Sequence, residues 1–287
     1  MNTNKAKETI KELSISELRP FKEHPYRVVD DEEMDRLVES IEEHGVMTPI
    51  NVRPIEGGYE VISGHRRIHA AKRVGLTTVP AIEMDMTRDQ AAVALVDSNL
   101  HRERLLPSEK AFAYKLKLEA LSRQGKRTDL TSSQVATKLD TADSIGSSLN
   151  ESRDTVYRYI RLTNLIPPLL RMVDEERIAF TPAVELSYLT QEEQEMLFTE
   201  IGVTLATPSL SQACRLKRMS GEGKLNEATI AAIMAEEKPN QREKVSVPLS
   251  ALKGKVPDSY TDRQLQEYVI KAVDHYHRYL MHQREVR

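Results

Sequence analysis

Two adjacent arginines at the start of a predicted helix form the most informative stretch of the sequence. Residues 59–72 read YEVISGHRRIHAAK, and the first half of this stretch has the β-branched character of a buried strand. Gly64 permits a tight turn into a helix, and Arg66 and Arg67 follow it directly. Free backbone N–H groups at a helix start attract anions, and guanidinium groups bind phosphate oxygens through paired hydrogen bonds. The stretch therefore predicts a polyphosphate site, with a solvated basic helix start as the alternative.

A second stretch, residues 144–160, fits the helix-turn-helix pattern. Gly146 occupies the position that must be small where two helices cross, and Asn150 occupies the turn position that needs a left-handed backbone. Ser152 can cap the second helix. The apolar positions that lock the two helices together are Ile145, Leu149, Val156 and Ile160.

The second helix of such a motif enters the major groove of DNA with its first turns facing the bases. The candidates for contacts with double-stranded DNA are Ser152, Arg153, Thr155, Tyr157 and Arg158. An arginine bound to guanine discriminates between bases by about 1 to 3 kcal/mol. For Tyr157 and Tyr159 the alternative is that one of them packs inward, and we expect this of Tyr159.

The composition is that of a water-soluble globular protein with two or three modest domains. The chain has 287 residues, of which 39% are hydrophobic and 30% are charged. No apolar run approaches the ~20 residues needed to span a bilayer, and the N-terminus lacks the apolar core of a signal peptide. We therefore expect a cytoplasmic protein with no membrane partner. The single cysteine, Cys214, is expected to be a small buried or half-buried residue on a helix.

The distribution of charge matters more than its total. The net charge of −3 by itself argues weakly against a nucleic-acid binder. Acidic residues gather within residues 30–43, whereas residues 115–127 and 153–171 are locally basic. The chain can therefore be acidic overall and still present one cationic surface.

The first predicted domain, residues 13–105, is a compact α+β unit that must position the two arginines. A flexible tail is expected before it, over residues 1–12. Helices are predicted over about 31–44, after Gly64 and over 88–99, and strands near 50–53, 59–62 and 78–83. The Gly57-Gly58 pair between two apolar runs indicates a hairpin.

Residues 106–235 predict an all-helical second domain, which contains the helix-turn-helix at 144–162. This domain begins near Pro107, a favourable first residue of a helix. Residues 236–287 predict a charged linker and a small C-terminal module, with a short strand near 245–249 and a last helix from 260 to about 284.

Three boxes in the first domain resemble the N-terminal domain of the ParB/RepB family of partition proteins. They are His24-Pro25-Tyr26-Arg27, Gly64-His65-Arg66-Arg67 and residues 98–109, which read SNLHRERLLPSE. The family's second box is usually Gly-Glu-Arg-Arg, so His65 is a departure. The resemblance covers residues 13 to about 189 and implies an α+β N-terminal ParB-like domain, followed by an all-α helix-turn-helix domain and a small C-terminal helical module.

In this family the boxes form a CTP pocket. The resemblance implies phosphate contacts from five residues, Gly64, Arg66, Arg67, Asn99 and Arg102. It places the turn that carries Gly45 and Thr48 near the base of the nucleotide. The family glutamate that holds magnesium falls at Ser98, and a hydroxyl is a poor substitute for a carboxylate as a ligand of a hard dication. CTP with Mg is the implied cofactor, with weak or absent hydrolysis, and no protein ligand of the metal is assigned.

The resemblance implies a sequence-specific DNA-binding partition protein of the plasmid or integrative-element type, associated with the nucleoid. Its implied partners are double-stranded DNA, a ParA-type ATPase and a second copy of the chain in a homodimer. One rival is a transcription regulator or nucleoid-occlusion-type factor with the same domains. Another is an enzyme of the related fold found in sulfiredoxins and free-serine kinases, against which the helix-turn-helix and the missing box glutamate both count.

Overall fold

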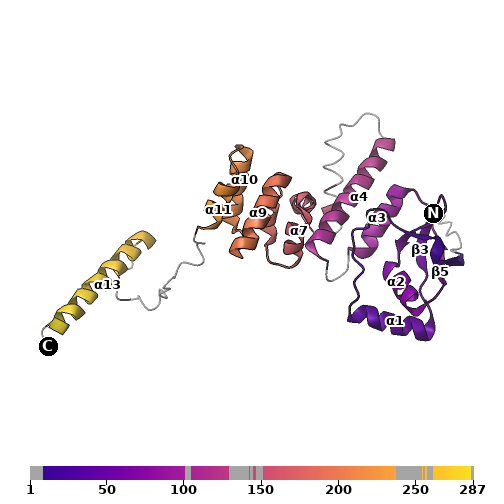
Figure 1. Ribbon diagram of the computed structural model, residues 1–287, viewed down its shortest axis with the longest axis horizontal. Coiled ribbons are helices and arrows are strands. Elements are labelled where there is room, and N and C mark those ends of the chain that lie inside the picture. Colours follow the sequence, from indigo (N-terminus) through magenta and orange to yellow (C-terminus); the bar gives the residue numbers. More distant parts are fainter. Residues whose placement is uncertain are drawn as a thin grey trace. The chain divides into compact units, whose positions relative to one another are not determined.

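The computed structural model describes residues 9–100, 105–128, 142, 145–146, 151–236, 254, 256 and 261–285. The chain divides into two compact units, residues 1–236 and residues 237–287. In the larger unit a β-sheet is followed by a series of helices, and the smaller unit contains the long helix α13, Asp262–Glu285 (Figure 1).

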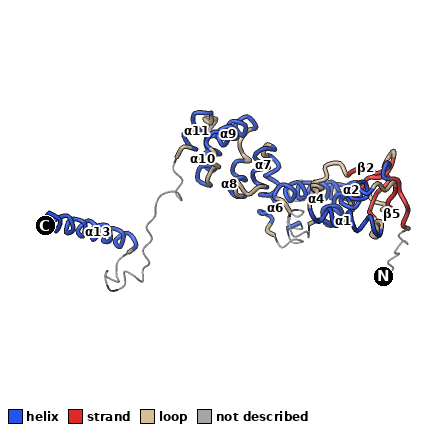
Figure 2. The backbone as a smooth tube through the Cα atoms, turned by 60° about the horizontal axis from the view of Figure 1, so that its bottom comes forward, coloured by secondary structure: helices blue, strands red, loops and turns tan. Residues whose placement is uncertain are grey.

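A mixed five-stranded sheet forms the first part of the larger unit (Figure 2). Its order is β1-β5-β3-β4-β2, with strands at Ile10–Ser14 (β1), Leu18–Pro20 (β2), Ile50–Ile55 (β3), Gly58–Ser63 (β4) and Thr78–Glu83 (β5). β3 and β4 are antiparallel and form the hairpin predicted at Gly57-Gly58, whereas β3 pairs in parallel with β5 and β4 pairs in parallel with β2. β4 is therefore an interior strand, and its last residue, Ser63, lies directly before the Gly64 turn.

The expected flexible tail over residues 1–12 is wrong for residues 10–12. These residues belong to β1, which runs antiparallel to β5 from Ile10↔Ile82 to Ser14↔Thr78. Lys11 also forms an ion pair with Glu83 at 2.7 Å. An edge strand is held by main-chain hydrogen bonds and needs few buried side chains, so a polar Lys/Glu-rich sequence does not reveal it.

Three helices accompany the sheet: α1, Glu32–His44; α2, His65–Val74; and α3, Arg88–Asn99. Each begins or ends within two residues of its predicted bounds. Asp31 caps α1, because its Oδ1 accepts a hydrogen bond from the Met34 N–H at 2.8 Å. α2 packs against α1 through the buried Met34, Ile41 and Ala70, and against the sheet through the buried Ile68 and Ala71.

The predicted helical region is helical throughout its described part. Its helices are α4, Pro107–Thr128; α6, Arg153–Arg161; α7, Pro167–Asp174; α8, Phe180–Leu186; α9, Gln191–Thr204; α10, Leu210–Gly221; and α11, Glu227–Met234. A short 3-10 helix, η2 at Leu162–Asn164, follows α6. α4 contacts α3, α6 and α7. One buried cluster includes Leu95, Tyr114, Ile145 and Val156, so residues 13–105 and 106–235 pack together within one compact unit.

The C-terminal helix α13 begins at Asp262, two residues after the predicted start, and several of its apolar side chains are exposed. Ile270, Val273 and Tyr276 are each about 60% exposed. The strand predicted near 245–249 lies outside the described residues.

Cys214 is exposed on α10, which corrects the expectation of a buried or half-buried thiol. The inward face of α10 is occupied instead by Ala213 and Leu216.

Among the described helices, none is both long enough and apolar enough to cross a bilayer.

Candidate functional site

The Gly64 turn joins β4 to α2 and can be made only by glycine. Gly64 has φ +103°, and a Cβ at this position would lie 2.5 Å from Cγ2 of the buried Ile50. The turn places the unpaired N–H groups at the start of α2 directly after an interior strand. The predicted strand-turn-helix geometry is therefore present.

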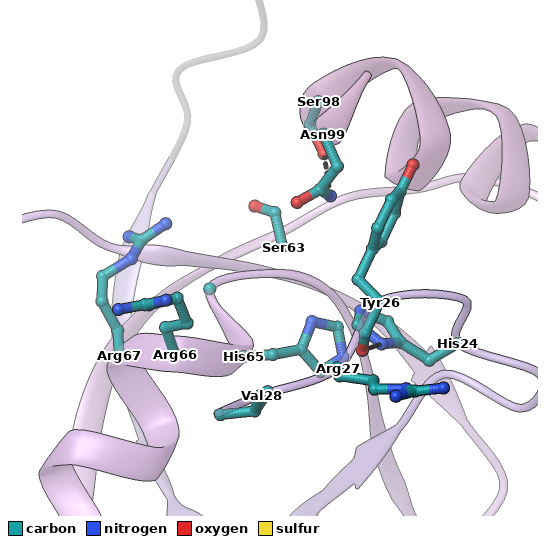
Figure 3. Close-up of a pocket in the computed structure, with 11 residues that line it drawn as sticks. His24, Tyr26, Arg27, Val28, Ser63, His65, Arg66, Arg67, Ser98 and Asn99 are labelled. Atoms are coloured by element: carbon teal, nitrogen blue, oxygen red, sulfur yellow. Dashed lines mark hydrogen bonds between the residues drawn. The ribbon is translucent and has the colours of Figure 1, made fainter. Parts of the chain in front are cut away.

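A cavity of about 310 Å³ opens at this turn (Figure 3). Four segments line it: the loop before α1, the end of β4, the start of α2 and the end of α3. The lining residues are His24, Tyr26, Arg27, Val28, Ser63, Gly64, His65, Arg66, Arg67, Ser98 and Asn99. The predicted Gly64, Arg66, Arg67 and Asn99 are thus brought together, and no carboxylate is among the described residues that line the cavity.

Arg66 is held by carboxylates at the start of α1. Its Nη2 lies 2.8 Å from Oδ1 of Asp31, its Nη1 lies 3.3 Å from Oδ2, and Glu33 is 3.6 Å away. The hydrogen bond from Arg66, followed by the one from the Met34 amide, lowers the pKa of Asp31. The carboxylate of Asp31 therefore accepts two hydrogen bonds from the Arg66 guanidinium, as two oxygens of a phosphate would.

Arg67 is held by main-chain oxygens instead. Its Nη1 donates to the carbonyl of Thr48 at 2.5 Å and also to the carbonyl of Pro49. Burial lowers the pKa of Arg67. Thr48 therefore supports Arg67 without itself lining the cavity, and Gly45 lies at the C-terminal end of α1 with φ +68°. The turn that carries both lies beside Arg67, and its place near the nucleotide base stays a prediction.

Two imidazoles in contact, tilted by 45° to each other, form part of the cavity wall. The rings of His24 and His65 have centroids 3.8 Å apart, and Nδ1 of His24 lies 2.7 Å from the carbonyl oxygen of Tyr26. Burial, together with the nearby His24, lowers the pKa of His65 to about 3. The His65 ring is therefore neutral at pH 7, and its buried Nε2 has no hydrogen-bond partner among the described residues.

The end of α3 supplies the last polar groups. Nδ2 of Asn99 donates to the Leu95 carbonyl at 2.9 Å and to Oγ of Ser98 at 3.1 Å, and Ser98 donates to the same carbonyl at 2.9 Å. Asp97, the adjacent carboxylate, pairs with Lys117 of α4 at 2.5 Å. Arg102, the remaining predicted phosphate ligand, lies outside the described residues.

These groups do not fit a magnesium ion held by the protein. Magnesium favours carboxylate and water oxygens in near-octahedral geometry. Ser98 is engaged within its own helix and Asp97 is engaged by Lys117. The described part of the chain holds no cluster of three or more His, Cys, Asp or Glu side chains suited to a metal.

The loop that lines the cavity is also bonded to the helical region. The Arg27 N–H donates to Oε1 of Glu109 at 2.8 Å, and Nη2 of Arg27 pairs with Asp174 at 3.2 Å. Asp174 also accepts hydrogen bonds from the N–H and hydroxyl of Ser108. Figure 3 shows the Arg27 guanidinium turned away from Arg66 and Arg67. Arg27 therefore connects the cavity wall to α4 and α7.

Helix α6 begins with the predicted cap, and the chain at Gly146 passes close to the residues just before this helix. Oγ of Ser152 accepts a hydrogen bond from the Thr155 N–H at 3.1 Å and lies 2.9 Å from the Thr155 hydroxyl. A Cβ at Gly146 would lie 2.5 Å from the carbonyl oxygen of Glu151, so the position must be glycine. Ile145 and Val156 are fully buried; Leu149 and Asn150 lie outside the described residues.

The DNA candidates on α6 differ in their surroundings. Arg153 lies 3.8 Å from Asp154, whereas Arg158 donates to the Thr181 hydroxyl at 2.9 Å and lies 5.0 Å from the Phe180 ring. Tyr157 is half-buried. Tyr159 packs inward between Tyr114 and Phe180, as predicted.

Comparisons with known proteins support the resemblance of the first domain to the N-terminal domain of ParB proteins. Residues 1–100 match the family model described as the ParB N-terminal domain. The chain is 30% identical over 251 residues to a probable chromosome-partitioning protein ParB of Vibrio cholerae, covering 83% of this chain and 81% of that protein.

Other relatives match over a shorter span. Stage 0 sporulation protein J of Bacillus subtilis is 34% identical over 170 residues, 59% of this chain and 54% of that protein. A nucleoid occlusion protein of Halalkalibacterium halodurans is 31% identical over 179 residues, 62% of this chain and 57% of that protein. The chain thus spans little more than half the length of these two relatives. Taken with the match to the Vibrio cholerae protein, these findings show that the chain belongs to the ParB family.

Proposed function

We propose that this chain is a DNA-binding partition protein whose N-terminal domain binds CTP. The observation that carries the nucleotide half is the cavity at the Gly64 turn, where two guanidinium groups, free helix N–H groups and the Asn99 amide meet with no lining carboxylate among the described residues. This combination suits a polyphosphate. The choice of CTP over other nucleotides rests on the resemblance of the three boxes to those of the family.

The DNA half of the proposal is a helix-turn-helix at residues 144–162. It is supported by the Ser152 cap, by the close approach that demands Gly146, and by the buried Ile145 and Val156. α6 is then the reading helix, with Arg153, Thr155 and Tyr157 near the bases. The partners proposed with this role are a ParA-type ATPase and a second copy of the chain.

Titration calorimetry with the four nucleoside triphosphates tests the nucleotide site. We expect CTP to bind more tightly than ATP, GTP and UTP, and an Arg66→Ala/Arg67→Ala double variant to lose binding. Equal affinity for all four nucleotides contradicts the choice of CTP. Binding retained by a folded double variant contradicts the site.

Binding and hydrolysis are proposed to be separate in this protein. A metal at the phosphates needs oxygen ligands to neutralise developing charge, and Ser98 supplies a hydroxyl already bonded to Leu95. Phosphate release with magnesium, CTP and specific DNA should be slow or absent in the wild-type protein and faster in Ser98→Glu. A rate unchanged or lowered by Ser98→Glu means that another residue holds the metal.

Recovery of genomic fragments after crosslinking tests the DNA half. Enrichment of one short sequence supports a specific site, and uniform recovery of the genome contradicts it. The position of the enriched sites also separates partition from a nucleoid-occlusion role, which the similarity to the Halalkalibacterium halodurans protein favours as the second candidate. A gene for a Walker-type ATPase beside this one supports partition, and a plasmid or integrative-element setting supports that type.

A further inference from the structure

A second cavity of about 430 Å³ lies beside α6, between α4, η2 and α8. α6 contributes Tyr157, Arg158 and Arg161 to its wall, α4 contributes Lys115, and Tyr188 follows α8. The described lining contains no aspartate or glutamate. The cavity therefore adjoins the exposed face of α6 and is bordered by three cations.

The partners of these cations are neutral. Arg158 donates to the Thr181 hydroxyl at 2.9 Å, and Arg161 donates to the Ser187 carbonyl at 2.9 Å with its guanidinium 3.8 Å from the Tyr188 ring. Lys115 is exposed. Within the described ranges no carboxylate lies within ion-pair distance of any of the three. Neutral acceptors and aromatic rings orient a guanidinium but leave its charge uncompensated.

Nearby carboxylates are engaged by other groups. Glu185 on α8 is held by Lys217 at 2.8 Å, and Glu151, just before α6, is held by Lys110 and by the Tyr114 hydroxyl. Nε of Arg161 is buried and has no hydrogen-bond partner in the described structure. An anion that enters the cavity therefore meets guanidinium and ammonium charge that no carboxylate of the described lining compensates.

We propose that this second cavity holds a backbone phosphate of the DNA duplex. The inference rests on the proposed DNA-binding function and adds the residues that hold the backbone: Lys115, Arg158 and Arg161. A cationic hollow focuses the field on a phosphate and sets the register of the protein on the duplex without reading its sequence. Arg158 is accordingly a phosphate ligand, while Arg153, five residues earlier and outside the lining, faces the bases.

The test uses Lys115→Ala in the full chain, because Lys115 is exposed and its loss leaves the fold intact. Binding to a random-sequence duplex and to a duplex recovered by crosslinking is measured against salt concentration. Each phosphate contact contributes a slope of about −0.9 in log K against log salt. We expect the slope to become shallower by about 0.9 and the affinity to fall by the same factor for both duplexes. Arg158→Gln should act in the same way.

Lys72→Ala is the matched control, since Lys72 is an exposed lysine on α2, outside both cavity linings. An unchanged slope in Lys115→Ala, or a loss confined to the recovered sequence, overturns the inference. So does Lys115-dependent binding of millimolar inorganic phosphate that leaves duplex binding unchanged, because the cavity is then a site for a free anion. If the wild-type protein binds no duplex at all, the proposed function itself fails.

Discussion

The two cavities are both rich in arginine but differ in what their arginines contact. At the Gly64 turn, Arg66 is bound by Asp31 and Glu33, and Arg67 is bound by two main-chain carbonyls. Beside α6, Arg158 and Arg161 contact a hydroxyl, a carbonyl and aromatic rings. An arginine of the first cavity is thus already paired with carboxylates that lie outside the lining, whereas the two arginines of the second contact only neutral groups.

This difference has a consequence for ligand binding. An anion that takes Arg66 must first displace Asp31, so part of its binding energy is spent on breaking an existing ion pair. An anion at Arg158 or Arg161 displaces no charged group. The first cavity therefore favours a ligand with several phosphates, whereas the second accepts the single charge of a backbone phosphate.

The largest expected effect tests whether Arg66 is released to the ligand. Arg66→Ala should weaken CTP binding by about 3 kcal/mol, on the order of 100-fold, because charge-assisted hydrogen bonds to phosphate are lost. Calorimetric titration measures the change. Arg73→Ala is the control, since Arg73 lies on the same helix and pairs with Asp30 and Asp35 outside the cavity lining. Equal losses in both variants would show that charge on α2 matters rather than the cavity.

A smaller effect is expected at α6, where Arg153 and Lys115 should behave differently. Arg153→Ala should reduce the preference for the recovered sequence over random DNA by about 2 kcal/mol, as expected for a lost base contact. Lys115→Ala should leave this preference unchanged. Competition binding with both duplexes measures the ratio. A uniform loss in Arg153→Ala assigns this arginine to the backbone as well.

The neutral imidazole of the first cavity predicts a dependence of stability on pH. The pKa of His65 is lowered to about 3, so the unfolded chain, with an ordinary pKa near 6.5, binds this proton more readily than the folded chain. The stability from His65 is complete above pH 6.5 and is lost as the pH falls towards 3. We expect a loss of about 1.6 kcal/mol between pH 6.5 and 5. Urea unfolding at several pH values measures it, and His65→Gln should flatten the dependence in this window.

The smallest expected effect concerns Asp31 itself. Asp31→Asn removes the charge that competes for Arg66 and keeps a good helix cap. CTP should then bind about two- to fivefold more tightly, the range set by an exposed ion pair. Calorimetry measures the affinity, and thermal unfolding checks that α1 is retained. Weaker binding in a folded variant means that Asp31 positions Arg66 for the ligand instead of competing with it.

Residues adjacent in the sequence were the easiest to assign. Gly64, Arg66 and Arg67 could be placed at a strand-to-helix turn because a β-branched run, a glycine and a helix pattern follow one another directly. The Ser152 cap could be placed for the same reason, since it depends on the Thr155 N–H three residues later. The acidic run at residues 30–43 was evident too, but only as a charged surface.

The sequence alone indicated the helices, the three inner strands, the glycine turn, the cap of α6 and the resemblance to the family, because each depends on residue types at short, fixed spacings; it did not reveal the edge strands β1 and β2. Only the tertiary structure decided which charges meet. Asp31 contacts Arg66 across 35 positions, Arg27 contacts Asp174 across 147, and Lys115 joins Arg158 and Arg161 at one cavity. Such contacts follow from how the helices and the sheet pack, because packing joins residues that are far apart in the sequence and stand at no fixed spacing.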